Sequence, residues 1–255
     1  MLPWTQLTEY WSDNTTASEI LEIFGRAPQL VKCTLRPLEE ESFLRCHIHL
    51  PLLQSLELTS CINPADLFDH LTLPSLCEFI YSEREPAAEE GWPNRQFVAL
   101  LTRSKCTLRR LDLDAILTEG DLVECLRCMP SLVELKLFEQ GASCITTETL
   151  SLLTNQGPSS ELCLVPKLQD IDLHCYGVLD GPAWVDMIQS RRMDDSLHGS
   201  THDGDARVAR IKRILLHWGH FEETPLSSRI DLDTIERLRQ FKREWLDISI
   251  IGSNF

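Results

Sequence analysis

Two pairs of aspartates are the residues whose type and spacing come closest to acid–base chemistry. They are Asp112 with Asp114 and Asp170 with Asp172. Alternate residues of a strand point to the same side of a sheet, so each pair would place two carboxylates on one face, an arrangement that general acid–base catalysis can use. Both pairs recur at equivalent positions of a repeated segment, and no signal of a neighbouring cavity accompanies them. A solvated acidic surface is therefore the better interpretation.

Two cysteine and histidine motifs have the spacing of metal ligands. Cys125-Leu-Arg-Cys128 resembles half of a zinc site, but no second half lies at a matching distance and the motif falls on an expected helix, which favours structural cysteines. His198-x-x-x-His202 lies among aspartates in a polar segment without a preformed cage, so weak adventitious binding is all that it predicts. The remaining histidines of note, interpreted as strand or loop residues, are His47, His49, His217 and His220.

Motifs of the common catalytic folds do not occur in the sequence. There is no Gly-x-x-x-x-Gly-Lys-Ser/Thr loop, no Gly-x-Gly-x-x-Gly turn, no Gly-x-Ser-x-Gly elbow and no His-Glu-x-x-His helix. We therefore predict that the chain is not an enzyme and has no catalytic residues, no cofactor and no metal site.

A repeated apolar pattern organises the chain. It reads Leu-x-x-Φ-x-Φ, where Φ is apolar, and five of its six clear copies carry a proline two residues ahead of the first leucine. Counted with two weaker copies, the first residues are separated by 23, 23, 23, 32, 24, 36 and 43 positions. A recurring unit of this length predicts stacked repeats instead of one closed core. The copies begin at Leu7 (weak), Leu30, Leu53, Leu76, Leu108, Leu132, Leu168 and Ile211 (weak).

Each copy predicts a strand followed by a helix. In the copy that begins at Leu53, alternating Leu56 and Leu58 have the period of a strand with one buried face, and Pro51 suits the loop before it. The next residues, 63–71, predict a helix with Asn63 as N-cap and Pro64 at the first helical position. Thr16 and Glu19 have capping-box spacing at the start of a helix over 16–24. Further helices are expected over 96–101, 118–129, 146–153, 182–190 and 231–241.

These elements predict an α/β fold in a single domain over residues 1–255. We expect an irregular solenoid arc with a parallel sheet on its concave face and helices on its convex face. The polar segment 193–205 is expected to be a disordered insertion. Residues 231–255 are expected to cap the open end of the array, and the apolar piece 246–251 within them is either a last strand or part of the cap.

Composition limits the partners and the compartment. Lys and Arg total 24 against 39 Asp and Glu, and the net charge of −15 disfavours binding to nucleic acid or to an anionic membrane. A basic cluster around Arg210 and Arg213 is interpreted as a solvated surface. No membrane-spanning run and no secretory signal are visible, so we expect a monomer in the cytoplasm or nucleus whose ten cysteines are reduced.

The residues between the Φ positions are expected to face solvent on the concave side. Over eight rows these 24 positions hold nine acids and five bases, with a few exposed apolar residues among them. Aromatic residues among charges are typical of a protein-binding surface, although a loop that partly covers them would explain the apolar residues equally well. The expected partner-binding residues are Trp11, Arg36, Glu57, Ile80, Arg110, Asp112, Asp114, Glu134, Lys136, Phe138, Asp170, Asp172 and His174.

The motif Leu-x-x-Leu-x-Leu-x-x-Cys from Leu53 to Cys61 resembles a leucine-rich repeat. The phrases Leu-Pro-Leu-Leu-Gln-Ser-Leu-Glu-Leu (50–58) and Met-Pro-Ser-Leu-Val-Glu-Leu-Lys-Leu (129–137) are similar to the repeat region of fungal F-box proteins, in particular those of basidiomycetes, and the resemblance extends from Leu2 to about Leu216. It implies a protein-binding module that selects substrates for a ubiquitin ligase.

In that family an N-terminal F-box binds the ligase adaptor, and no F-box is visible in this sequence, so we expect an adaptor as partner only if an F-box lies upstream. The alternative is a stand-alone acidic scaffold or inhibitor that binds a basic protein, similar in principle to cytosolic ribonuclease inhibitors.

Overall fold

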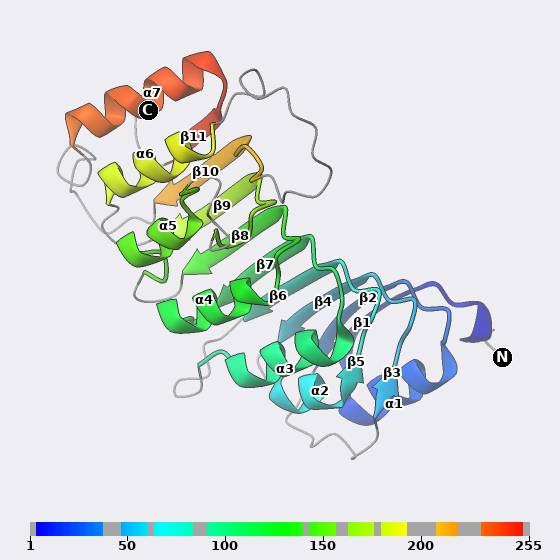
Figure 1. The fold of residues 1–255 in the computed structure, drawn as a ribbon. Coiled ribbons are helices and arrows are strands. Elements are labelled where there is room, and N and C mark those ends of the chain that lie inside the picture. The colour runs from blue at the N-terminus through cyan, green and yellow to red at the C-terminus, as the bar shows by residue number, and fades with distance from the viewer. Residues whose placement is uncertain are drawn as a thin grey trace, which may run out of the picture. The chain divides into compact units, whose positions relative to one another are not determined.

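The computed structural model describes residues 4–37, 47–60, 64–83, 91–139, 143–156, 163–175, 180–192, 208–218 and 231–251. The chain divides into two compact units, residues 1–117 and 118–255. In each unit parallel strands alternate with helices along the chain, so both units are α/β (Figure 1). The single domain over 1–255 and the solenoid arc stay predictions.

The first unit contains a parallel sheet of five strands and three α-helices. After a short 3-10 helix (η1, Trp4–Gln6), the sheet runs in the order β1, β2, β4, β6, β7, and two very short strands, β3 and β5, pair separately in parallel. The strands are β1 (Glu9–Thr15), β2 (Lys32–Pro37), β3 (Ile48–His49), β4 (Ser55–Ser60), β5 (Leu71–Thr72), β6 (Glu78–Glu83) and β7 (Arg110–Ala115), and the helices are α1 (Ala17–Arg26), α2 (Ala65–His70) and α3 (Asn94–Ser104).

The repeated Φ residues form the core of this unit, as the sequence predicts. Leu56 of β4 pairs in register with Cys33 of β2 and with Phe79 of β6, and all three are fully buried. The Phe79 ring contacts Phe68 of α2 and Phe97 of α3, with ring centroids 5.8 and 4.9 Å apart. The helices therefore cover the side of the sheet to which the Φ residues point.

Local sequence signals set most helix ends, with one correction. The capping box of Thr16 and Glu19 is confirmed at the start of α1. The helix expected over 63–71 is shorter: α2 begins at Ala65, Pro64 is its cap residue and not its first helical residue, and Leu71 already belongs to β5. Asn63, the expected N-cap, lies outside the described residues. Leu71 instead pairs in register with Ile48 of β3, a contact between separate segments that the local helical pattern does not encode.

The second unit contains four parallel strands in the order β8, β9, β10, β11 and four α-helices. Residues 231–251 of the expected capping segment form a helix and the last strand, which pairs with β10, so the piece 246–251 is a strand. The expected insertion 193–205 lies outside the described residues. The strands are β8 (Glu134–Glu139), β9 (Asp170–Cys175), β10 (Arg213–Trp218) and β11 (Asp247–Ile251), and the helices are α4 (Glu119–Arg127), α5 (Thr147–Leu153), α6 (Gly181–Ser190) and α7 (Leu232–Glu244).

Helices of the second unit also cover the Φ side of its sheet. Trp184 of α6 and Leu238 of α7 line one small apolar cavity together with Ile214 of β10 and Ile248 of β11. These four side chains are buried, as are the other Φ residues of β8 to β11. The same strand-and-helix packing thus recurs within both units.

The cysteines that the structure describes behave as buried or half-buried free thiols. Seven are free, among them Cys33 in the core of the first unit and Cys125 in α4. Burial raises the pKa of Cys33 to about 12 and that of Cys106 to about 11, so both stay protonated at neutral pH. None of the helices in the described ranges is both long enough and apolar enough to cross a membrane.

Candidate functional site

The candidate site is the side of each sheet that carries the residues between the Φ positions, which we call the strand face. Side chains of alternate strand residues point to opposite sides, so these residues lie on the side away from the helices. Register places them in rows: Trp11 lies beside Thr34 in β1 and β2, and Glu57 beside Ile80 in β4 and β6. The rows inferred from the repeat spacing are confirmed wherever the strand register is described within a unit.

The charged residues on the strand face of the first unit are joined across strands. Arg36 of β2 forms an ion pair with Asp13 of β1 at 3.0 Å. Arg110 of β7 does the same with Glu78 of β6 at 3.2 Å. Each of these side chains keeps part of its surface in solvent, and ion pairs of this kind contribute only about 0–1 kcal/mol to stability. These ion pairs therefore add little to the stability of the sheet.

Two residues of this face are more buried than the sequence indicates. Thr34 and Ser55 were expected to face solvent, but both are buried. The Thr34 hydroxyl donates to the Glu57 carboxylate at 3.1 Å, and the Ser55 hydroxyl donates to Glu78 at 2.8 Å. The longer acidic side chains of the neighbouring strands reach over the short hydroxyl residues and cover them. The acidic groups are thereby held in place on the outer surface of the face.

Apolar residues interrupt the charges on this face. Trp11 on β1 is 61% exposed, so most of its surface is open to solvent. Ile80 on β6 is half-buried and lies in register between Glu57 and Asp112. Asp114 of β7 accepts a hydrogen bond from Ser82 at 3.1 Å. The first unit thus presents an exposed indole and an apolar side chain among fixed carboxylates.

The strand face of the second unit carries a second set of charges. The Arg213 guanidinium lies 3.2 Å from Asp170 and 3.9 Å from Glu134, so one arginine serves acids of two strands. Lys136 of β8 lies in register beside Asp172 of β9. Glu134, Lys136, Asp170 and Asp172, all expected at a binding surface, thus lie together on one face of this unit.

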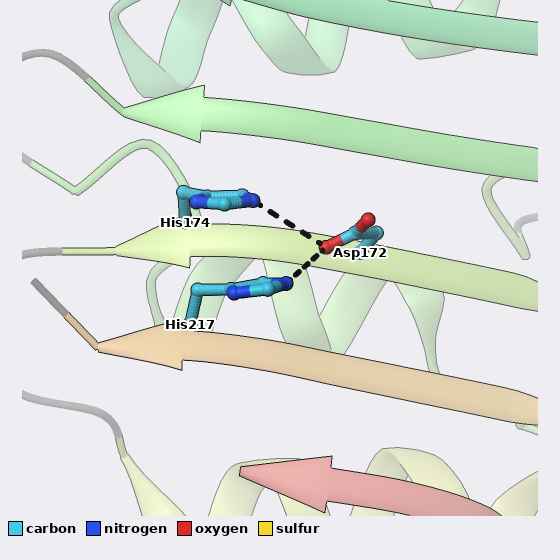
Figure 2. A group of neighbouring side chains, drawn as sticks. All are labelled: Asp172, His174 and His217. Atoms are coloured by element: carbon cyan, nitrogen blue, oxygen red, sulfur yellow. Dashed lines mark ion pairs between the residues drawn. The ribbon is translucent and has the colours of Figure 1, made fainter. Parts of the chain in front are cut away.

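Aromatic rings cross the same face in a row. The ring of Phe138 on β8 stacks on His174 of β9, with centroids 4.8 Å apart and an angle of 29° between the planes. His174 stacks in turn on His217 of β10, with centroids 3.8 Å apart and planes at 6°. Figure 2 shows both imidazoles directed toward the carboxylate of Asp172. Oδ1 of Asp172 lies 3.8 Å from Nε2 of His174 and 3.3 Å from Nε2 of His217.

The Asp172 carboxylate is unusual because its Oδ1 atom is buried and accepts no hydrogen bond. Buried carboxylate oxygens normally have a partner. Among the described residues, Asp172, His174 and His217 form a group of side chains with the types and spacing of metal ligands.

His217 is absent from the predicted partner-binding residues. His217 can be identified by aligning the repeats, because the last two copies place it in register beside His174.

Among the described residues, the other candidate motifs do not assemble into sites. Cys125 is buried in α4, and Cys128 is half-buried at the end of that helix. His198 and His202 lie outside the described residues. The aspartate pairs of β7 and β9 lie on the strand faces, as predicted.

A scan against models of known protein families finds no match, and no curated protein matches the chain. The fold and the strand faces therefore define its class on their own: an α/β protein whose repeated strands present rows of polar side chains on the side away from the helices.

Proposed function

We propose that the chain is a leucine-rich-repeat protein that binds another protein through its strand faces. In this proposal the repeats form a solenoid arc with the strand faces on the concave side and the helices on the convex side. The burial of the Φ residues and the row-by-row register within each unit support it. Repeats of this kind supply extended binding surfaces.

The partner that fits these faces is a basic protein segment with an apolar anchor. The single observation that carries this proposal is the exposed Trp11 indole on a face where acids outnumber bases. The arginines at positions 36, 110 and 213 are already paired with acids of neighbouring strands, which leaves the negative charge dominant. Tryptophan is among the residues that most often dominate the binding energy of an interface. Carboxylates around it would attract and orient a cationic partner.

Within this proposal, the resemblance to fungal F-box repeats favours the role of substrate receptor in a ubiquitin ligase. The captured partner would then be a ligase substrate, and an adaptor would join through an F-box of the same polypeptide. The net charge of −15 favours a second role, that of an acidic scaffold or inhibitor of a basic protein. The two roles differ in whether a ligase adaptor accompanies the chain, and the second requires an affinity that falls steeply with salt.

Capture from native cells with matched charge variants tests the proposal. Glu57→Lys reverses a charge on the strand face, while Glu22→Lys makes the same change on α1, where Glu22 pairs with Arg26 at the surface. We expect Glu57→Lys and Trp11→Ala to remove the same specific protein from the captured set, and Glu22→Lys to retain it. Equal loss in Glu57→Lys and Glu22→Lys, or no loss in Glu57→Lys and Trp11→Ala, would refute binding at this face.

A stability control separates lost binding from lost folding. Leu56 is fully buried, so Leu56→Asp places an unpaired charge in the core and should lower the free energy of unfolding by several kcal/mol. The three surface variants should melt within a few degrees of the unmodified protein. A surface variant that melts as early as Leu56→Asp would show that the assignment of faces is wrong.

A further inference from the structure

The strand face of the second unit contains a site for a divalent transition-metal ion, which we infer from the geometry of Asp172, His174 and His217. The three side chains come from adjacent strands: His174 and His217 are in register on β9 and β10, and Asp172 lies two residues before His174 on the same face. All candidate donor atoms lie within 4.8 Å of one another. The inference does not depend on the binding of a protein partner.

The donor separations are close to those of a coordination sphere. With metal–nitrogen and metal–oxygen bonds of about 2.0–2.2 Å, two ligands of a tetrahedral ion lie roughly 3.3 Å apart. Oδ1 of Asp172 is 3.3 Å from Nε2 of His217 and 3.8 Å from Nε2 of His174. Shifts of about half an ångström in the carboxylate contacts, with rotation of the rings, bring the three donors onto one ion. The scaffold is preorganised because both strands belong to a hydrogen-bonded parallel sheet.

The orphaned carboxylate oxygen supports a cation at this place. Oδ1 of Asp172 is buried and accepts no hydrogen bond, although it is the atom toward which both imidazoles are directed (Figure 2). A metal ion between the three side chains would satisfy this oxygen and could be coordinated by both Nε2 atoms as well. Oδ1 of Asp172 is already 3.3 Å from Nε2 of His217, so the larger adjustment falls on the contact with His174, whose ring stacks on both Phe138 and His217.

The donor set selects the class of ion. Two imidazoles and one carboxylate suit Zn²⁺, and also Cu²⁺ or Ni²⁺, whereas Mg²⁺ and Ca²⁺ prefer oxygen ligands alone. Three protein ligands leave a fourth position of a tetrahedral ion open to water or to an incoming side chain. Lys136 lies beside Asp172 in register and opposes the bound charge, while Arg213 is engaged by Asp170.

Titration of the chelator-treated full-length protein with Zn²⁺ tests the inference. We expect one Zn²⁺ per chain by calorimetry, and an affinity at least about tenfold lower in each of Asp172→Asn, His174→Gln and His217→Gln, since even the loss of a residue that supports a ligand reduces affinity by about 10–100-fold. The double variant His198→Gln/His202→Gln is the matched control, because it removes two histidines with ligand spacing that lie elsewhere in the sequence. It should bind Zn²⁺ like the unmodified protein.

Two further readouts keep the result decisive. Zn²⁺ should raise the melting temperature of the unmodified protein and of the control, but not of a variant that has lost the site. Co²⁺ should give visible d–d absorption without a cobalt–thiolate charge-transfer band. The inference is wrong if Zn²⁺ does not bind, if binding survives both Asp172→Asn and His217→Gln, if it disappears in the control, or if Co²⁺ produces a thiolate band. Circular dichroism verifies that each variant is folded. Only the folded variants among Asp172→Asn, His174→Gln and His217→Gln are used to judge the inference.

Discussion

Replacement of Arg191 by methionine is expected to destabilise the second unit strongly. Arg191 follows α6 and is only 1% exposed. Its Nε donates to the carbonyl of Leu153 at 2.7 Å, Nη2 to that of Leu164 at 2.9 Å, and Nη1 to that of Val165 at 3.3 Å. Leu153 is the last residue of α5, where carbonyls have no partner within the helix. Burial lowers the pKa of Arg191, and the nearby Cys163 opposes this, but a guanidinium stays charged at neutral pH.

The expected loss follows from these three contacts. Methionine fills much of the same volume but leaves the carbonyls of Leu153 and Leu164 with only the weak thiol donor of Cys163, whereas the carbonyl of Val165 keeps the backbone N–H of Leu168. Each buried carbonyl that loses its strong donor costs about 1–3 kcal/mol. Removing the buried cation also returns its desolvation penalty, which is several kcal/mol in the folded protein. Because the returned desolvation penalty cancels part of this loss, we expect the free energy of unfolding to fall by about 2–4 kcal/mol.

Urea unfolding of Arg191→Met and Arg192→Met measures this effect against a neighbour. Arg192 forms an ion pair with Glu244 at 2.9 Å, but the two side chains are 49% and 35% exposed, so its removal should cost about 0–1 kcal/mol. Arg191→Lys should lie between the two, because an ammonium keeps the charge without the guanidinium fork. If Arg191→Met and Arg192→Met unfold within about 0.5 kcal/mol of each other, the buried hydrogen bonds do not support the unit and the reasoning is refuted.

Two further predictions concern the contacts between helices of the second unit. Desolvation raises the pKa of Glu119, but hydrogen bonds from Thr146 and Thr149 outweigh it and lower the pKa in the folded protein. Glu119 therefore contributes stability above its unfolded-state pKa of about 4.3, and this contribution is lost as the pH falls through the lowered folded-state pKa. The urea midpoints of Glu119→Gln and of the unmodified protein should differ at pH 7 and converge in acid. A difference that stays constant with pH would contradict this prediction. A Cβ at Gly181 would lie 2.7 Å from Cγ2 of Thr234, so Gly181→Ala should cost about 1–3 kcal/mol, and the cost should shrink in a Thr234→Ala background. Strictly additive midpoints would show that α6 and α7 do not pack as described.

The sequence predicts most of the framework because its signals are local. Buried Φ positions such as Leu56 follow from a period of two, and the capping box of Thr16 and Glu19 needs only four residues. The row-by-row register follows from the same repeat, since aligned copies place equivalent residues side by side. Each of these inferences requires only residues within one copy or the comparison of two copies.

Other features depend on contacts between segments and left no local signal. The strand pairing of Ile48 with Leu71 ends α2 early, although the sequence there continues a helical pattern. Arg103 of α3 donates hydrogen bonds to the carbonyls of Phe68 and Leu71, as Arg191 does to carbonyls at and after the end of α5. An arginine near a helix end is common, so its presence in the sequence does not predict such a hydrogen bond. Thr34 is buried only because the Glu57 side chain of the next strand covers it.

The Asp172 cluster shows why a search for motifs along the chain misses a site of this kind. His174 and His217 are 43 residues apart, and along the chain the neighbour of His217 that stands out is His220, which does not identify His174 as its partner. The repeat converts that separation into a register pair on adjacent strands, so the relevant spacing is measured across rows and not along the chain. The row of His174 and His217 does not by itself identify Asp172 as the third ligand. Asp172 also lies beside Lys136 and on the same face as Arg213, so these cations compete with the imidazoles for its carboxylate. Arg213 is held by Asp170 at 3.2 Å, and the Asp172 carboxylate is directed toward the two imidazoles. The site therefore arises from competition among charges on one face. Substitution of Asp170 by asparagine removes the closer of the two acids that hold Arg213 and keeps the longer contact with Glu134, so it should weaken Zn²⁺ binding without removing a ligand.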